Sequence, residues 1–197
     1  IKGIVSLADK YVEVGTVDAD WYEDTLEFDG FEGTIAGLKN TDNATISVIG
    51  ETKLVLGAAL KAATVEIDED CKLTVPEASV ETISGDGTFA FPAGKLFIED
   101  SVTDTTLQVT EGLAAGVTAF TCYTDAVAED DFVALGYTVE FKPVNDDIDK
   151  AVVKALSFAG LSFDKTAVEV AKGYETTITV ANYPAGTKLP EGASIEW

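Results

Sequence analysis

Short segments of alternating apolar and polar residues fill the middle of the chain, from residue 44 to residue 109. Side chains alternate between the two faces of a β-strand, so each pair of nearby apolar residues predicts a short strand with one buried face. The pairs are Ile46/Val48, Leu54/Leu56, Val65/Ile67, Leu73/Val75, Val80/Ile83, Phe89/Phe91, Leu96/Ile98 and Leu107/Val109. The pattern therefore predicts an all-β ladder of strands.

The spacing of these segments suggests how the ladder folds. The segments that begin at Ile46 and Leu54 recur at Val65 and Leu73, about 19 residues later. Such a repeat favours a β-solenoid, in which successive coils stack in parallel with aligned apolar side chains inside. An antiparallel strand ladder is the alternative, because Ser84-Gly85-Asp86-Gly87 is a good tight-turn sequence for a hairpin.

Residues 1–43, before the ladder, contain an acidic and aromatic patch. It holds Asp18, Asp20, Trp21, Tyr22, Glu23, Asp24, Phe28, Asp29 and Phe31. We expect these residues to cap the open end of the ladder, with the acids in solvent. Two alternatives remain: the patch contacts a glycan by stacking through Trp21, Tyr22, Phe28 and Phe31, or its carboxylates bind calcium, although their spacing differs from an EF-hand loop.

Further strands are expected over residues 113–142, which would complete a β-rich domain at 1–142. A short connecting helix is predicted over 143–160, because Ile148, Val152 and Leu156 fall on one helical stripe. Asn145 or Asp146 can cap its start and Gly160 stands at its end. A strand continuing from Val152 is the alternative.

The last segment, residues 161–197, carries a recognisable motif. It opens with Leu161-Ser162-Phe163-Asp164-Lys165-Thr166, continues through a Lys172-Gly173 turn and the strand Ile178-Thr179-Val180, and closes with Ile195-Glu196-Trp197 after Pro184. These residues resemble the first half of a bacterial Ig-like domain of the group 2 (BIG2) family. The resemblance implies a partial β-sandwich used as a spacer, stalk or adhesion module on bacterial surface proteins or phage structural proteins, without catalytic residues.

A domain of that family would continue past Trp197 with further strands. Truncation explains the difference most simply. The alternative is strand addition at the edge formed by Ser194, Ile195 and Trp197, with the added strand supplied by residues 1–14 or by a neighbouring molecule.

The charge of the chain narrows the classes of partner. There are 35 acidic residues and 13 basic ones, all lysine, and the net charge is −22. A strongly anionic chain without arginine argues against binding to nucleic acid or to an anionic membrane surface.

Histidine is absent, so a Ser-His-Asp or Cys-His catalytic site cannot be assembled. No apolar run reaches the roughly 18 residues of a membrane span.

Two cysteines, Cys71 and Cys122, allow a single disulfide. A cross-link closing a loop of that size would stabilise the fold by about 4 kcal/mol in the chain-entropy model. Two separate buried thiols are the simpler interpretation, because free cysteine packs as a small hydrophobic residue and no pairing geometry is then required.

Together these features predict a non-catalytic structural or adhesive module of an exterior surface protein, with a role in display, spacing and protein–protein assembly. The expected location is extracellular, at a cell surface or on a virion exterior, and no cofactor is expected. One alternative is a phage capsid or tail decoration or fibre protein. Another is a carbohydrate-binding module or a polysaccharide-active β-helix protein, since paired carboxylates are available for glycoside chemistry.

Overall fold

The computed structural model describes residues 2–4, 7–13, 25–163 and 179–188. Within these ranges every regular element is a β-strand, which confirms the all-β class. The strands are β1 (Lys2–Ile4), β2 (Leu7–Glu13), β3 (Thr25–Lys39), β4 (Thr45–Ile49), β5 (Lys53–Leu56), β6 (Leu60–Ile67), β7 (Lys72–Thr74), β8 (Ala78–Ser84), β9 (Thr88–Phe91), β10 (Leu96–Thr103), β11 (Thr106–Val109), β12 (Thr118–Tyr123), β13 (Val133–Ala134), β14 (Tyr137–Pro143), β15 (Ile148–Leu156), β16 (Gly160–Phe163) and β17 (Val180–Tyr183).

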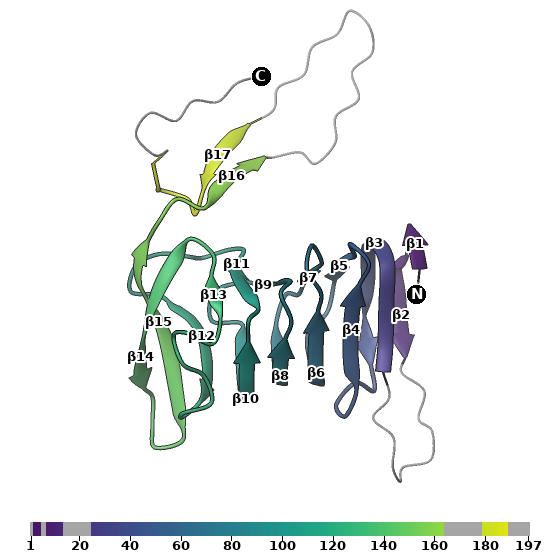
Figure 1. The fold of residues 1–197 in the computed structure, drawn as a ribbon, viewed down its shortest axis with the longest axis horizontal. Coiled ribbons are helices and arrows are strands. Elements are labelled where there is room, and N and C mark those ends of the chain that lie inside the picture. The colour runs from purple at the N-terminus through teal and green to yellow at the C-terminus, as the bar shows by residue number, and fades with distance from the viewer. Residues whose placement is uncertain (1, 5–6, 14–24, 164–178, 189–197) are drawn as a thin grey trace, which may run out of the picture.

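The central strands form a parallel solenoid rather than a meander. The even-numbered strands β4, β6, β8, β10 and β12 are parallel neighbours, and so are the odd-numbered strands β5, β7, β9, β11 and β13. The long strand β3 pairs with both β4 and β5 and so joins the two runs. Figure 1 shows the even-numbered strands standing side by side along the stack. Each coil therefore contributes one even and one odd strand.

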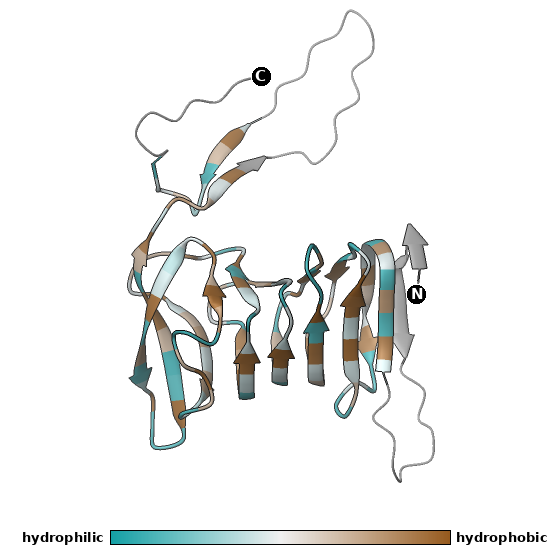
Figure 2. Cartoon of the chain, in the orientation of Figure 1, coloured by the Kyte–Doolittle hydropathy of each residue, from teal (hydrophilic) through white to brown (hydrophobic). Residues whose placement is uncertain are grey.

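The apolar repeat read from the sequence is the spacing of the coils. Ile46 lies opposite Val65, and Leu54 lies opposite Leu73, in the parallel register. The second of these columns continues through Phe89 to Leu107, and all four of its side chains are fully buried. The bands of brown on the strands in Figure 2 show the same alternation. One continuous core thus runs through the stack.

Two buried threonines hold the corners between even and odd strands. The Thr52 hydroxyl accepts a hydrogen bond from the Phe31 backbone N–H at 3.0 Å and donates one to the Ile49 carbonyl at 2.6 Å. The Thr105 hydroxyl donates to the Gly85 carbonyl at 3.0 Å. Both residues are fully buried, and these bonds remove the cost of burying a polar group without a partner.

The predicted helix over residues 143–160 is wrong. The segment forms β15, which pairs antiparallel with β12 on one side and with β14 on the other. A spacing of four residues suits one stripe of a helix but also one face of a strand, so Ile148, Val152 and Leu156 could not decide between them. The three consecutive residues Ala151, Val152 and Val153 are buried, as expected for a strand covered on both faces.

After β15 the chain forms a separate antiparallel pair, β16 and β17, which lies above the end of the stack in Figure 1. One hydrogen bond ties this pair to the solenoid: the Tyr183 hydroxyl donates to the Val109 carbonyl of β11 at 2.9 Å. Within the pair, the Ala159 backbone N–H donates to the Tyr183 carbonyl at 2.9 Å. Most of the segment that resembles a BIG2 domain lies outside the described residues, so that resemblance stays a prediction.

Candidate functional site

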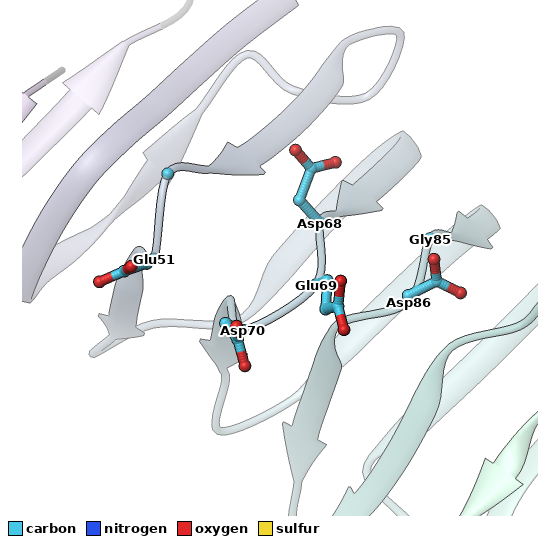
Figure 3. A pocket seen from close by; sticks show the side chains of 7 residues that line it. Glu51, Asp68, Glu69, Asp70, Gly85 and Asp86 are labelled. Carbon is cyan, nitrogen blue, oxygen red and sulfur yellow. The ribbon is translucent and has the colours of Figure 1, made fainter.

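Carboxylates gather at one corner of the stack, where even strands pass to odd strands. Successive coils supply them, because the repeat places an acidic turn at the same point of each coil. Together they line a shallow cavity of about 450 Å³ formed by Gly50, Glu51, Asp68, Glu69, Asp70, Gly85 and Asp86. Figure 3 shows the side chains of this acidic corner.

The backbone at the acidic corner explains its composition. The turns require left-handed backbone at Gly50 (φ 65°), Glu51 (φ 62°), Asp70 (φ 62°) and Gly85 (φ 97°). Glycine adopts that conformation without a steric penalty, and aspartate tolerates it better than most residues. The residue types that allow the chain to turn here therefore also concentrate negative charge at this edge of the stack.

The arrangement of these carboxylates does not create a metal centre. In Figure 3 the Glu51, Asp68 and Asp70 side chains point in different directions rather than toward one point. Within the described ranges there is no group of three or more His, Cys, Asp or Glu residues that could hold a metal ion. Asp18, Asp20, Glu23 and Asp24, which carried the calcium alternative, lie outside those ranges. What the corner provides is a solvated anionic surface that attracts cations diffusely.

The alternative of a glycan contact is wrong for Phe28 and Phe31. Both phenylalanines are fully buried, and their rings meet edge to face with centroids 5.8 Å apart. They are core residues of β3 and offer no face to a sugar. Trp21 and Tyr22, the other two residues of that hypothesis, lie outside the described residues, and so do Ser194, Ile195 and Trp197 of the proposed strand-addition edge.

The possible disulfide between Cys71 and Cys122 is not formed, since both are free buried thiols. Their places in the coil register separate them. The Cys71 carbonyl accepts a hydrogen bond from the Thr88 backbone N–H at a corner of the stack. Cys122 lies in β12 beside Ile98 of β10. The simpler alternative from the sequence, two separate thiols packed in the core, is the correct one.

Because burial raises the pKa of Cys122 to about 11, with a further contribution from the negative charge of Asp149, we expect this thiol to be inert in the folded protein. At pH 8 only about one Cys122 thiol in a thousand would be ionised, against roughly a quarter for an ordinary cysteine. Burial also raises the pKa of Cys71. Titration with a disulfide reagent at pH 8 should detect both thiols in urea and neither in buffer. Rapid reaction of the folded protein would contradict this assignment.

A second cluster lies at the end of β12 and was not singled out from the sequence. Tyr123, Thr124, Asp125, Asp146 and Asp147 line an open depression of about 690 Å³. It is built from two segments that are distant in sequence, and the Tyr123–Ile148 register between β12 and β15 brings them together. The sequence signal that was available is an aromatic residue at a strand end beside acidic turn residues.

Comparison with known proteins gives no relative: no protein-family model, no curated protein and no solved structure matches this chain. Among the residues that the structure describes, no helix is long and apolar enough to cross a membrane.

Proposed function

We propose that this chain is a non-catalytic structural module of an exterior surface protein, in which the solenoid acts as a stiff spacer that presents a C-terminal module and takes part in protein–protein assembly. The observation that carries the proposal is the uninterrupted core: the column Leu54, Leu73, Phe89 and Leu107 is fully buried and crosses four successive coils in register.

Stiffness follows from the pairing of the strands. Each of the strands β4 to β11 hydrogen-bonds to a parallel neighbour on both sides. Bending the rod would break backbone hydrogen bonds on one side and open the packed core, and each unpaired buried backbone group costs about 1–3 kcal/mol. A chain whose coils cannot hinge independently is suited to holding two points at a fixed separation.

The junction with β16 and β17 supports the display role. Gly136 lies so close to Pro184 that a Cβ at this glycine would be 2.6 Å from the proline Cδ. The Tyr183 hydroxyl is hydrogen-bonded to the Val109 carbonyl of β11 at 2.9 Å. Two contacts on different parts of the last coils restrain rotation about the linker, so the C-terminal strand pair is presented in a defined orientation.

The surface charge fits an exposed setting. A net charge of −22 keeps neighbouring copies apart by repulsion and favours solubility. The acidic corner, with its divergent carboxylates, supports this role rather than a catalytic one, because glycoside cleavage needs two carboxyl groups that oppose each other across a bound sugar.

The spacer proposal is tested by measuring a distance along the rod. We expect spin labels on Val55→Cys in β5 and Val133→Cys in β13 to give one narrow distance distribution near four strand spacings, roughly 19 Å plus the label tethers. These valines are 39% and 55% exposed, whereas the buried native thiols should stay unlabelled. Duplicating residues 57–75, one coil, should lengthen the distance by about 4.8 Å.

A broad distribution, or a distance that does not change when the coil is duplicated, would show that the stack is not a stiff rod. Hydrolysis of a polysaccharide by the purified chain, abolished by Asp68→Asn or Glu69→Gln, would contradict the non-catalytic part of the proposal.

A further inference from the structure

Aromatic side chains form an exposed pair at one end of β12. Tyr123 is 44% exposed, and its ring packs edge to face on that of Phe97, with centroids 5.2 Å apart and planes at 84°. Phe97 is itself partly exposed on the neighbouring strand β10. Most large apolar side chains of the described residues are in the core. An aromatic pair left on the outside, with one ring fixed by the other, is the kind of anchor that protein interfaces use.

Hydrogen bonds fix the backbone of the loop that carries Asp146 and Asp147 beside this pair. The Thr124 backbone N–H donates to the Asp147 carbonyl at 2.8 Å, which ties the end of β12 to the loop between β14 and β15. The Asn145 side-chain oxygen accepts hydrogen bonds from the backbone N–H groups of Asp147 and Ile148, each at 2.9 Å. The loop, at the lower left of Figure 1, is therefore preorganised in the free protein, which reduces the conformational entropy lost on binding.

We name this surface the Tyr123 corner; its lining residues are Tyr123, Thr124, Asp125, Asp146 and Asp147. Its three carboxylates form no ion pair with another described residue. Lys150 lies nearby in the strand register, opposite Thr121, and is not part of the lining. Val144, on the same loop as Asp146 and Asp147, is 55% exposed and adds apolar surface.

We propose that the Tyr123 corner docks a basic segment of a protein partner, with an arginine or lysine side chain over the Tyr123 ring and its charge between Asp125, Asp146 and Asp147. A cation is attracted to the face of an aromatic ring, and complementary charge speeds encounter and fixes register. Three exposed charges of one sign match a cation better than a neutral sugar. The inference rests on the assembly role proposed above, for which it names the partner chemistry.

The test separates this corner from the general negative charge of the chain. The probe is a fluorescent hexa-arginine peptide, titrated into the full chain at 0.15 M salt and followed by anisotropy. We expect Tyr123→Ala to weaken binding about two- to fivefold, the range of an exposed cation–π contact. Asp125→Asn/Asp146→Asn/Asp147→Asn should weaken it roughly tenfold. Asparagine suits position 125, where the backbone is left-handed (φ 64°).

The matched control removes the same number of charges at the acidic corner, which has no aromatic residue in its lining. Glu69→Gln/Asp70→Asn/Asp86→Asn includes one position with a nearly identical backbone, Asp70 at φ 62°. We expect this variant to bind almost as tightly as the native chain. Tyr123→Leu keeps apolar bulk without the ring and should bind as weakly as Tyr123→Ala.

Several results would overturn the proposal: equal losses in the two triple variants, tight binding by Tyr123→Leu, no binding of the peptide by the native chain, or Tyr123-dependent binding of a neutral oligosaccharide in its place. Unchanged far-ultraviolet circular dichroism and melting temperature establish that each variant is folded. The spin-label distance between positions 55 and 133 tests the spacer role independently of peptide binding. A result that contradicts docking at the Tyr123 corner is therefore distinguishable from one that contradicts the stiff spacer.

Discussion

Phe89→Ala is expected to lower the free energy of unfolding by about 3–5 kcal/mol, the usual cost of truncating a buried phenylalanine. Phe89 is fully buried and lies between Leu73 and Leu107 in the column that runs through the stack. Its ring also packs against Phe91, with centroids 6.0 Å apart. The strands on either side are held by backbone hydrogen bonds, so the walls of the cavity cannot collapse easily, and the cost should fall near the upper end.

Equilibrium unfolding in urea at 25 °C, followed by circular dichroism, measures this loss. Val55→Ala on β5 is the control, because Val55 is 39% exposed and its truncation should cost less than about 1 kcal/mol. Equal losses in the two variants would mean that the column is not the core of the fold. Because each coil is stabilised mainly by its neighbours, we also expect Phe89→Ala to destabilise the coils on both sides of β9.

The sequence predicted the coil spacing because, in a solenoid, residues that are one repeat apart in the sequence also lie opposite each other on neighbouring strands. The pairs 46/65 and 54/73 chosen from the sequence are opposite residues in the structure. Ser84-Gly85-Asp86-Gly87, which suggested a hairpin, is a turn between β8 and β9, and these strands pair with other coils rather than with each other. A tight turn alone does not reveal which strands its two ends will pair with.

Phe28 and Phe31 show where alternation fails. Residues three apart face opposite sides of a flat strand, so the pattern could not predict that both are buried. Gly30 lies between them with left-handed backbone (φ 63°), and the chain turns there from the part of β3 that pairs with β4 to the part that pairs with β5. Because the chain turns a corner at Gly30, the side chains on both sides of it point into the interior. The glycine is the only sign of this corner in the sequence.

The Tyr123 corner could not be derived from the sequence for a different reason. Its residues come from the end of β12 and from the loop before β15, and the register between those strands brings them together. The helix predicted over residues 143–160 would place Asp146 and Asp147 at a helix start rather than beside an aromatic pair. A site that depends on the pairing of two strands cannot be predicted from the sequence when one of those strands is taken for a helix.

Gly85→Ala should destabilise the fold by about 3 kcal/mol or more, because two separate costs meet at this corner. Gly85 has left-handed backbone (φ 97°), and a Cβ added there would lie 2.3 Å from the Ile67 carbonyl oxygen of the preceding coil. That oxygen accepts a hydrogen bond from the Gly87 backbone N–H at 2.9 Å. Moving it away would therefore disturb the contact that holds two successive corners together.

Gly116→Ala measures the first cost, that of the left-handed backbone, without the clash. Gly116 is also left-handed (φ 83°), but a Cβ there would meet nothing within 4 Å, so its replacement should cost only the backbone term of about 1–2 kcal/mol. The difference between the two variants in urea unfolding measures how closely the coils approach at the acidic corner. If Gly85→Ala cost no more than Gly116→Ala, the coils could separate freely there, and the stack would lack the tight corner on which a stiff spacer depends.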